Sequence, residues 1–282
     1  MIITDRFVMI NFPKTGTTFA RKMLEELYQK KRKKESIAEK LYCLLQLKKR
    51  PLFKNIMLPQ TEFVGGNNAK SHQHGRWEQI PNPYKDRPVV GIVRNPYERN
   101  ISNYEYRWWA NHPIAPREVL IDEFPNFPDL SFEEYIRYQN FNTRYRINEI
   151  KLKTVLGNQT VQFIQFFFKD PRRVLSVIDD EYIGSGAYRE DMPNITFLKT
   201  ENLNEDLYCF LLKHGHNKEE LAFILDRKRL RPENTKRSSD QERKNYLTKD
   251  LIDLINWQER LLFKIYQDYG IIYNSEYSGP QK

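Results

Sequence analysis

Residues 7–19 read FVMINFPKTGTTF, and this stretch decides the fold that we expect. A hydrophobic run ends at Pro13, and Lys14, Thr15 and Gly16 follow it. The next apolar residues have the i, i+3, i+4, i+7 spacing of a buried helix face: Ala20, Met23, Leu24 and Leu27. The sequence therefore predicts a strand, a tight loop and a helix in direct succession.

The residue types in this loop suit the binding of a phosphate group. A helix N-terminus presents unpaired N–H groups and partial positive charge. Gly16 lets a ligand approach the backbone, Thr17 and Thr18 add hydroxyl donors, and Lys14 adds a full charge. Lys14 precedes Gly16, the only glycine of this loop, which distinguishes the loop from the triphosphate-binding pattern G-x-x-x-x-G-K-[ST]. The alternative is an ordinary strand–helix connection that contains a lysine by chance.

Residues 89–106, VVGIVRNPYERNISNYEY, form the second informative segment. The apolar run 89–93 predicts a buried parallel strand with Arg94 at its carboxyl end. Pro96 is suited to the first turn of a helix, which would carry Ser102 about two turns farther on. Ligands of open α/β sheets bind outside the carboxyl ends of the strands, so we expect Arg94 and Lys14 to lie at one edge. The planar guanidinium of Arg94 is well shaped for a phosphate.

Residues 69–74, AKSHQH, form the third segment and contain His72 and His74. A single histidine is more often structural than catalytic. Two histidines at this spacing also resemble half of a metal site, but cysteine and acidic partners at zinc spacing are absent from the sequence. We therefore expect no metal.

Together the three segments resemble the sulfotransferases that use 3′-phosphoadenosine 5′-phosphosulfate (PAPS). Residues 13–19 match the family's P-K-[ST]-G-T-T-[WF] signature. Arg94 and Ser102 match its arginine at a strand end and the serine eight residues later. Residues 70–72 match the K-[ST]-H motif of its cytosolic branch, in which the histidine lies 22 residues before that arginine, as His72 does here.

The resemblance implies a role for each matched residue. Lys14 would stabilise the oxygen that departs as sulfate is transferred, and the loop residues would hold the 5′-phosphate: Lys14, Thr15, Gly16, Thr17 and Thr18. Arg94 and Ser102 would hold the 3′-phosphate.

Phe19 matches the aromatic residue that stacks on adenine, with core packing as the alternative. His72 matches the general base, and a neutral histidine suits that task near pH 7. Glu62 and Glu78 are the reserve bases, because carbohydrate branches often use a glutamate.

The later part of the chain agrees with the family less closely. Residues 197–203 look like its strand followed by E-x-L, and residues 247–270 look like its C-terminal helix. The R-K-G element that binds the 3′-phosphate in cytosolic members is absent. Residues 234–238 lie at a similar place and resemble the basic segment of carbohydrate and bacterial members. Lys236, Arg237 and Ser238 are therefore the expected substitutes.

Composition limits the remaining possibilities. With 282 residues, 39% hydrophobic and 13% aromatic, and with no linker or repeat, we expect a single domain over residues 1–282. No signal peptide, membrane-length apolar run or disulfide framework is visible, which favours a cytoplasmic protein. The net charge of +9 indicates a solvated basic face or attraction of an anionic ligand.

Five further stretches carry structural expectations. Four prolines in residues 111–129 argue against a continuous helix there, and this stretch is a candidate loop over the acceptor site. Residues 132–138 and 149–155 are expected to be helical, and the aromatic run 163–168 is expected in the core. The aromatics of residues 104–109 would pack in a helix, line an acceptor pocket or stack on nucleic-acid bases.

We therefore predict a three-layer α/β fold with a central parallel sheet, similar to P-loop nucleotide-binding proteins. The predicted function is transfer of sulfate from PAPS to a hydroxyl of a small-molecule, lipid or carbohydrate acceptor. A kinase-like phosphotransferase, which would need ATP and Mg²⁺, and a basic nucleic-acid-binding module are the alternatives.

Overall fold

The computed structural model describes residues 1–34, 43, 45, 51–59, 73–228 and 246–273. Within them, five strands form one sheet in the order β3-β1-β2-β4-β5. The strands are β1 (Ile2–Thr4), β2 (Val8–Ile10), β3 (Phe53–Asn55), β4 (Val89–Val93) and β5 (Ile195–Lys199). β2, β4 and β5 are parallel, as predicted, whereas β1 pairs antiparallel with both β2 and β3. The sheet is thus mixed, with its parallel part at β2, β4 and β5.

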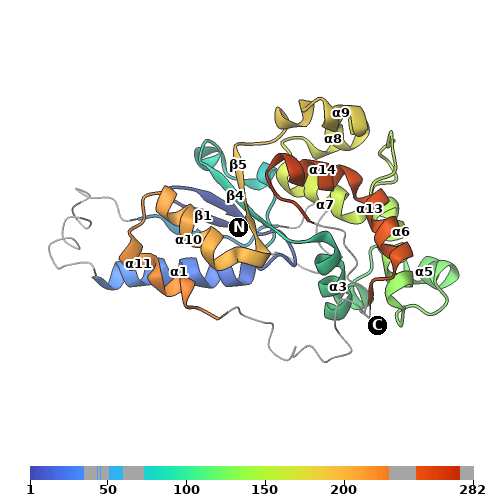
Figure 1. Cartoon of the computed structure of the whole chain (residues 1–282), viewed down its shortest axis with the longest axis horizontal. Coiled ribbons are helices and arrows are strands. Elements are labelled where there is room, and N and C mark those ends of the chain that lie inside the picture. Colours follow the sequence, from blue (N-terminus) through green and yellow to red (C-terminus); the bar gives the residue numbers. More distant parts are fainter. Residues whose placement is uncertain (35–42, 44, 46–50, 60–72, 229–245, 274–282) are drawn as a thin grey trace.

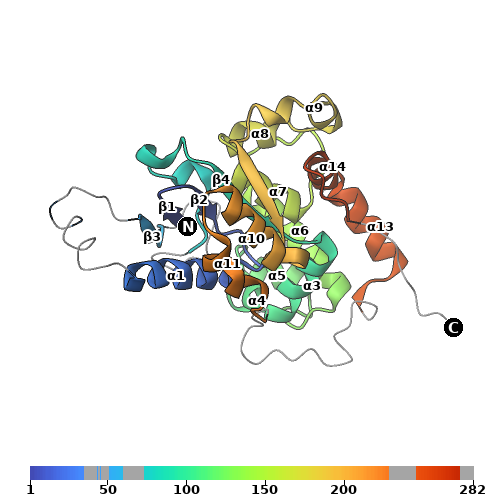
Figure 2. The same ribbon diagram turned by 60° about the vertical axis from the view of Figure 1, so that its left-hand side comes forward.

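Helices cover both faces of the sheet, so the three-layer α/β prediction is confirmed (Figures 1 and 2). Val90 and Ile92 face one layer, and Val89 and Val93 face the other, as alternation along a strand requires. The first layer contains α1 (Thr17–Lys34), α10 (Leu203–Lys213) and α11 (Lys218–Leu225). The second contains α7 (Asn158–Phe167), α8 (Pro171–Val177), α9 (Asp180–Gly184) and α14 (Arg260–Asp268).

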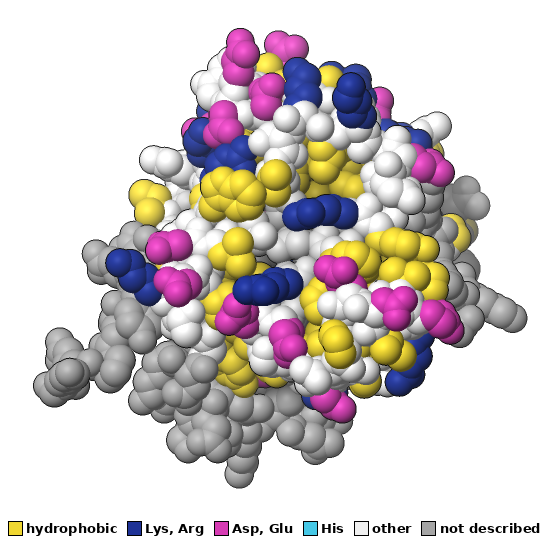
Figure 3. Space-filling model, turned by 90° about the vertical axis from the view of Figure 1, so that its right-hand side faces the viewer, with side chains coloured by type: hydrophobic (Ala, Val, Ile, Leu, Met, Phe, Trp, Pro, Cys, Tyr) yellow, Lys and Arg dark blue, Asp and Glu magenta, His cyan; other side chains and the backbone are white. Residues whose placement is uncertain are grey.

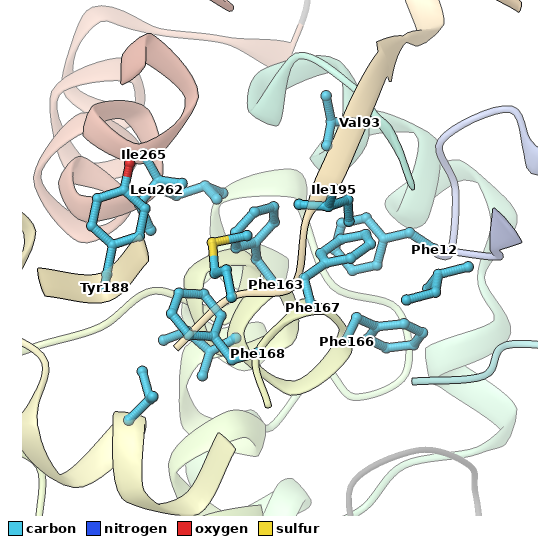
Figure 4. Close-up of a cluster of buried hydrophobic side chains, with 14 of the residues drawn as sticks. Phe12, Val93, Phe163, Phe166, Phe167, Phe168, Tyr188, Ile195, Leu262 and Ile265 are labelled. Carbon is cyan, nitrogen blue, oxygen red and sulfur yellow. The ribbon is translucent and has the colours of Figure 1, made fainter. Parts of the chain in front are cut away.

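The predicted helix after the loop and the predicted aromatic core are both present. α1 begins at Thr17, and its expected apolar face, Ala20, Met23, Leu24 and Leu27, is buried. The aromatic residues of 163–168 are buried under the second layer, where the ring of Phe12 packs beside Phe166 and Phe167 (Figure 4). Because Phe12 belongs to the loop after β2, the core itself holds one end of that loop.

A third apolar cluster lies beside the sheet. Its helices are α3 (Pro96–Tyr106), α4 (Trp108–Asn111), α5 (Arg117–Glu123), α6 (Phe132–Arg146) and α13 (Lys249–Gln258). On the side that bears α5, α6 and α13, hydrophobic side chains are exposed among acidic and basic ones (Figure 3). Within the described residues, no helix combines the length and apolar character that crossing a membrane requires.

Several boundaries differ from the sequence-based predictions. Residues 149–155 do not form a helix, because Arg260 binds the Val155 carbonyl and the Thr154 hydroxyl and holds this stretch against α14. The single helix predicted for residues 247–270 is two helices, α13 and α14, which are separated by Glu259. The proline-rich stretch 111–129 is not one helix, as predicted, and contains the short helix α5.

Candidate functional site

The carboxyl ends of the three parallel strands meet at one edge of the sheet. β2 leads into the loop of residues 11–16, β4 into Arg94, and β5 into the 3₁₀ turn η4 (Thr200–Asn202). The Thr200 hydroxyl lies 2.7 Å from the Thr15 carbonyl oxygen and 2.9 Å from the Val93 carbonyl oxygen. Thr15 belongs to the loop after β2, Val93 ends β4 and Thr200 follows β5, so this hydroxyl connects the carboxyl ends of all three strands. Arg94 Nη1 lies 3.5 Å from the Lys14 carbonyl oxygen. The prediction that Arg94 and Lys14 share an edge is confirmed.

The loop backbone takes left-handed conformations at two positions. Lys14 has φ 64° and Gly16 has φ 85°. Gly16 also lies close to α10, since a Cβ there would be 3.0 Å from Leu203 Cδ2. Glycine therefore suits position 16 on two counts, whereas the left-handed conformation of Lys14 costs free energy that its surroundings must supply.

Three successive carbonyl groups of the loop are held by side chains from other elements. Arg99 Nε donates to the Pro13 carbonyl at 3.0 Å. Arg94 contacts the Lys14 carbonyl, and Thr200 contacts the Thr15 carbonyl. In a trans peptide the C=O and the following N–H point in opposite directions. The N–H groups of Lys14, Thr15 and Gly16 therefore point away from these anchors.

These N–H groups have no acceptor in the described part of the chain. The same holds for the N–H groups of Thr17 and Thr18, the first two residues of α1. Five consecutive amide donors, from residue 14 to residue 18, are thus available at a helix N-terminus. Such an arrangement of left-handed turns and helix start is typical of anion-binding backbone concavities.

Lys14 is half-buried and lies among other cations. Its Nζ is 3.8 Å from the centre of the exposed Tyr106 ring at the end of α3. Burial and the positive charge of Arg94 lower the pKa of Lys14 from 10.5 to about 8, although Glu105 opposes the shift. A bound anion would stabilise the charged lysine and raise its pKa again.

The threonines of the loop differ in what they can offer a ligand. The Thr15 hydroxyl is fully buried and donates to the Phe12 carbonyl at 2.9 Å, so it closes the loop. Only the backbone N–H of Thr15 is left for a ligand. Thr17 is buried at 4% exposure, and Thr18 is exposed at the start of α1.

Phe19 and Ser102 are placed by the helices that carry them. Phe19 is 4% exposed and packs in the apolar cluster between the sheet, α1 and α10. This agrees with the core-packing alternative, and the stacking of adenine on Phe19 stays a prediction. Ser102 lies half-buried on α3, and no hydrogen bond joins its hydroxyl to another residue in the described ranges.

The expected base and the late basic segment fall outside the described residues. This applies to His72 with Lys70 and Ser71, to the reserve base Glu62, and to Lys236, Arg237 and Ser238.

The chain that follows His72 is described and lies against the start of the loop. Asn11 Nδ2 donates to the Gln73 carbonyl at 3.1 Å, and His74 Nδ1 lies 2.9 Å from the Asn11 carbonyl oxygen. Glu78, the other reserve base, forms an ion pair with the buried Arg76.

The aromatic residues at the end of α3 divide into a packed pair and an exposed pair. Tyr104 and Trp109 stack with their planes 14° apart inside the third cluster, in agreement with the packing alternative. Tyr106 is 58% exposed and Trp108 is 44% exposed, and Trp108 stacks on His112. Only the exposed pair is accessible to an acceptor.

Sequence reasoning missed three residues that build the site: Arg99, Thr200 and Glu259. Arg99 and Glu259 have long charged side chains in segments that the sequence predicts as helical, which favours an exposed position, yet both are buried. Thr200 stands directly after a predicted strand. Its position at the carboxyl end of that strand was the one available signal.

No protein-family model matches the chain, and no curated protein matches it. Among solved structures, it is similar to the crystal structure of mouse sulfotransferase SULT7A1 complexed with PAP. The TM-score is 0.41 and the identity is 14%, over 91% of this chain and 85% of that chain. A likeness at this level does not show family membership.

Proposed function

We propose that the protein is a sulfotransferase that transfers the sulfuryl group of PAPS to a hydroxyl of an acceptor. The observation that carries this proposal is the loop after β2. The three anchored carbonyls turn the N–H groups of residues 14–16 away from the anchors, and the start of α1 adds those of Thr17 and Thr18. Lys14 belongs to the same loop, and Arg94 lies at the same edge. The PAPS-dependent family to which the sequence motifs correspond places the same residue types at this edge.

The residues of the site fit a donor that carries two separate phosphate groups. The amides of residues 14–18 and the Lys14 ammonium would hold the 5′-phosphosulfate. Arg94, whose side chain is 20% exposed, would hold the 3′-phosphate together with Ser102. Each charge-assisted hydrogen bond of this kind contributes about 1.5–3 kcal/mol. Lys236, Arg237 and Ser238 stay predicted contributors to the 3′-phosphate site.

The chemistry assigned to this chain needs one cation and one base. The acceptor oxygen forms a bond to sulfur while the bond between sulfur and the bridging phosphate oxygen breaks, which releases adenosine 3′,5′-bisphosphate (PAP). Negative charge grows on that bridging oxygen, and Lys14 would stabilise it. The acceptor hydroxyl loses its proton as the new bond forms, and His72 is the proposed base.

The acceptor is proposed to be a small molecule, lipid or carbohydrate with a free hydroxyl. Its side of the site would be formed by the exposed Tyr106 and Trp108 and by the proline-rich stretch that follows them. We further propose that residues 1–282 act as one catalytic domain, and the cytoplasmic setting stays a prediction.

The test is turnover of PAPS in the presence of a panel of aryl, sugar and lipid alcohols, with PAP release as the readout and Mg²⁺ absent. We expect PAP release that depends on one acceptor class. His72→Ala should keep PAP binding and lose about 10²–10⁴-fold in kcat, the usual contribution of a general base. ATP consumption that requires Mg²⁺, or salt-dependent oligonucleotide binding without turnover, would overturn the proposal in favour of the two alternatives.

A further inference from the structure

Arg99 is a buried arginine that no motif of the sequence accounts for. It lies on α3 and is 1% exposed. All three of its nitrogens donate: Nε to the Pro13 carbonyl at 3.0 Å, Nη1 to Gln159 Oε1 at 3.3 Å and Nη2 to Gln162 Oε1 at 2.6 Å. Its guanidinium also lies 4.1 Å from the centre of the Phe12 ring. Arg99 thus joins both Phe12 and Pro13 of the loop to α7.

The groups that hold Arg99 are themselves fixed. Gln159 Nε2 donates to the Pro96 carbonyl at 2.7 Å, which orients its Oε1 toward Arg99. The backbone N–H of Gln159 donates to Glu259 Oε1 at 3.0 Å, and both the N–H and the hydroxyl of Thr160 donate to Glu259 Oε2. Glu259 therefore caps α7 from the break between α13 and α14.

The absence of a side chain at one position makes this capping possible. Gly157, the residue before α7, has no side chain to cap the helix, and a Cβ there would overlap the Glu259 carboxylate. The buried chain of contacts runs from Glu259 through Gln159 to Arg99 and ends at the loop. Every contact in it joins segments that are far apart in the sequence.

Burying a charged arginine against neutral acceptors is costly. Burial lowers the pKa of Arg99 to about 10, so it still carries its charge at neutral pH. Among the described residues, its hydrogen-bond acceptors are two amide oxygens and one backbone carbonyl. The charge of the buried Glu259 carboxylate offsets part of this cost, and one of the three guanidinium nitrogens is held by the Pro13 carbonyl of the loop.

We propose that Arg99 is a positioning residue, which fixes the Pro13–Lys14 peptide so that the Lys14 N–H and side chain face the donor phosphates. It acts through the loop and does not touch the donor. The anchored Pro13 carbonyl also helps to maintain the left-handed conformation of Lys14. The inference rests on the proposed function for the identity of the donor.

The test compares Arg99→Lys, Gln162→Met and the control Arg137→Lys, whose parent arginine is exposed and pairs with Glu133. Arg99→Lys keeps the charge, but its single nitrogen cannot replace three guanidinium nitrogens that reach three separately placed acceptors. We expect it to weaken PAP binding at least tenfold in calorimetry and to raise the KM for PAPS while the acceptor KM is unchanged. Gln162→Met leaves Arg99 in place with one acceptor fewer, and should weaken PAP binding about threefold. Arg137→Lys should match the wild type.

A purely structural role for Arg99 would give a different pattern. It would lower kcat in proportion to the unfolded fraction and leave both KM values unchanged, which would overturn the proposal. If Arg99→Lys does not fold, unchanged PAP affinity in Gln162→Met would overturn it as well.

Inorganic pyrophosphate, titrated in parallel, separates this proposal from the proposed function. A wild-type protein that binds pyrophosphate but not PAP contradicts the sulfotransferase assignment, and the Arg99 comparison is then made with pyrophosphate. A wild-type protein that binds neither contradicts both.

Discussion

The two ends of α3 approach the same lysine in opposite ways. At its N-terminal end, Pro96, Tyr97, Arg99, Asn100 and Ile101 are buried, and Arg99 holds the backbone before Lys14. At its C-terminal end, Tyr106 is 58% exposed and covers the Lys14 ammonium with its ring. The first contact depends on a buried polar network that reaches α7 and Glu259, whereas the second depends on one exposed side chain. We infer that the buried end of α3 sets the backbone geometry of the loop and that the exposed end adjusts only the Lys14 side chain.

The largest expected effect, on kcat, comes from removing the ammonium group of Lys14, the residue that both ends of α3 contact. Lys14→Met should keep the fold and lose about 10²–10³-fold in kcat, the usual effect of removing one group that stabilises a developing oxyanion. Lys22→Met is the matched control, because Lys22 is an exposed lysine on α1, the helix that follows the loop, and it should keep full turnover. Steady-state kinetics with PAPS measure both. Full turnover in Lys14→Met would contradict the role of this lysine.

Gly157→Ala tests the buried end of the comparison. The added methyl group would displace the Glu259 carboxylate, and overpacking of this kind costs about 1–3 kcal/mol in the free energy of unfolding. Gly184→Ala is the control, since a Cβ at that position would have no other atom within 4 Å, and it should change stability by less than about 0.5 kcal/mol. Denaturant unfolding measures both variants, and equal stabilities would contradict the importance of the Glu259 cap.

The pH dependence of PAP binding sharpens the description of Lys14. Because its pKa is about 8 in the free protein, Lys14 loses its charge above pH 8, and PAP affinity should then fall about tenfold per pH unit. The Lys14→Met variant should show no such fall. Between pH 8 and 10.5 the unfolded chain binds the extra proton at this lysine, so the contribution of Lys14 to folding stability rises with pH in that window. A wild-type affinity that is constant from pH 7 to 9.5 would show that Lys14 does not bind the donor.

The smallest effect is expected at the exposed end of α3. Tyr106→Leu removes the ring over Lys14, and an exposed cation–π contact contributes about 0.5–1 kcal/mol, so kcat/KM for PAPS should fall about two- to fivefold. Tyr145→Leu is the control, because Tyr145 is an exposed tyrosine of α6 with no assigned role in the site, and it should leave this value unchanged. A loss in Tyr106→Leu as large as that in Arg99→Lys would contradict the proposed ranking of the two ends.

The same contrast explains how much could be predicted from the sequence. The strand, loop and helix around Lys14 follow local rules of periodicity and glycine conformation, and the structure confirms them together with the shared edge of Lys14 and Arg94. Arg99, Thr200 and Glu259 act on residues far from them in the sequence, so no local pattern could reveal their partners. The break at Glu259 was missed for this reason, since residues 247–270 have the composition of one uninterrupted helix.

The most direct test of the central claim is a calorimetric titration of the wild-type protein with PAP, compared with ADP and 5′-AMP, in the absence of Mg²⁺. The account predicts micromolar binding of PAP, much tighter than that of ADP and weakened in Arg94→Ala, because the 3′-phosphate would lose its guanidinium partner. Binding of ADP that equals or exceeds that of PAP, or binding of neither nucleotide, would contradict it.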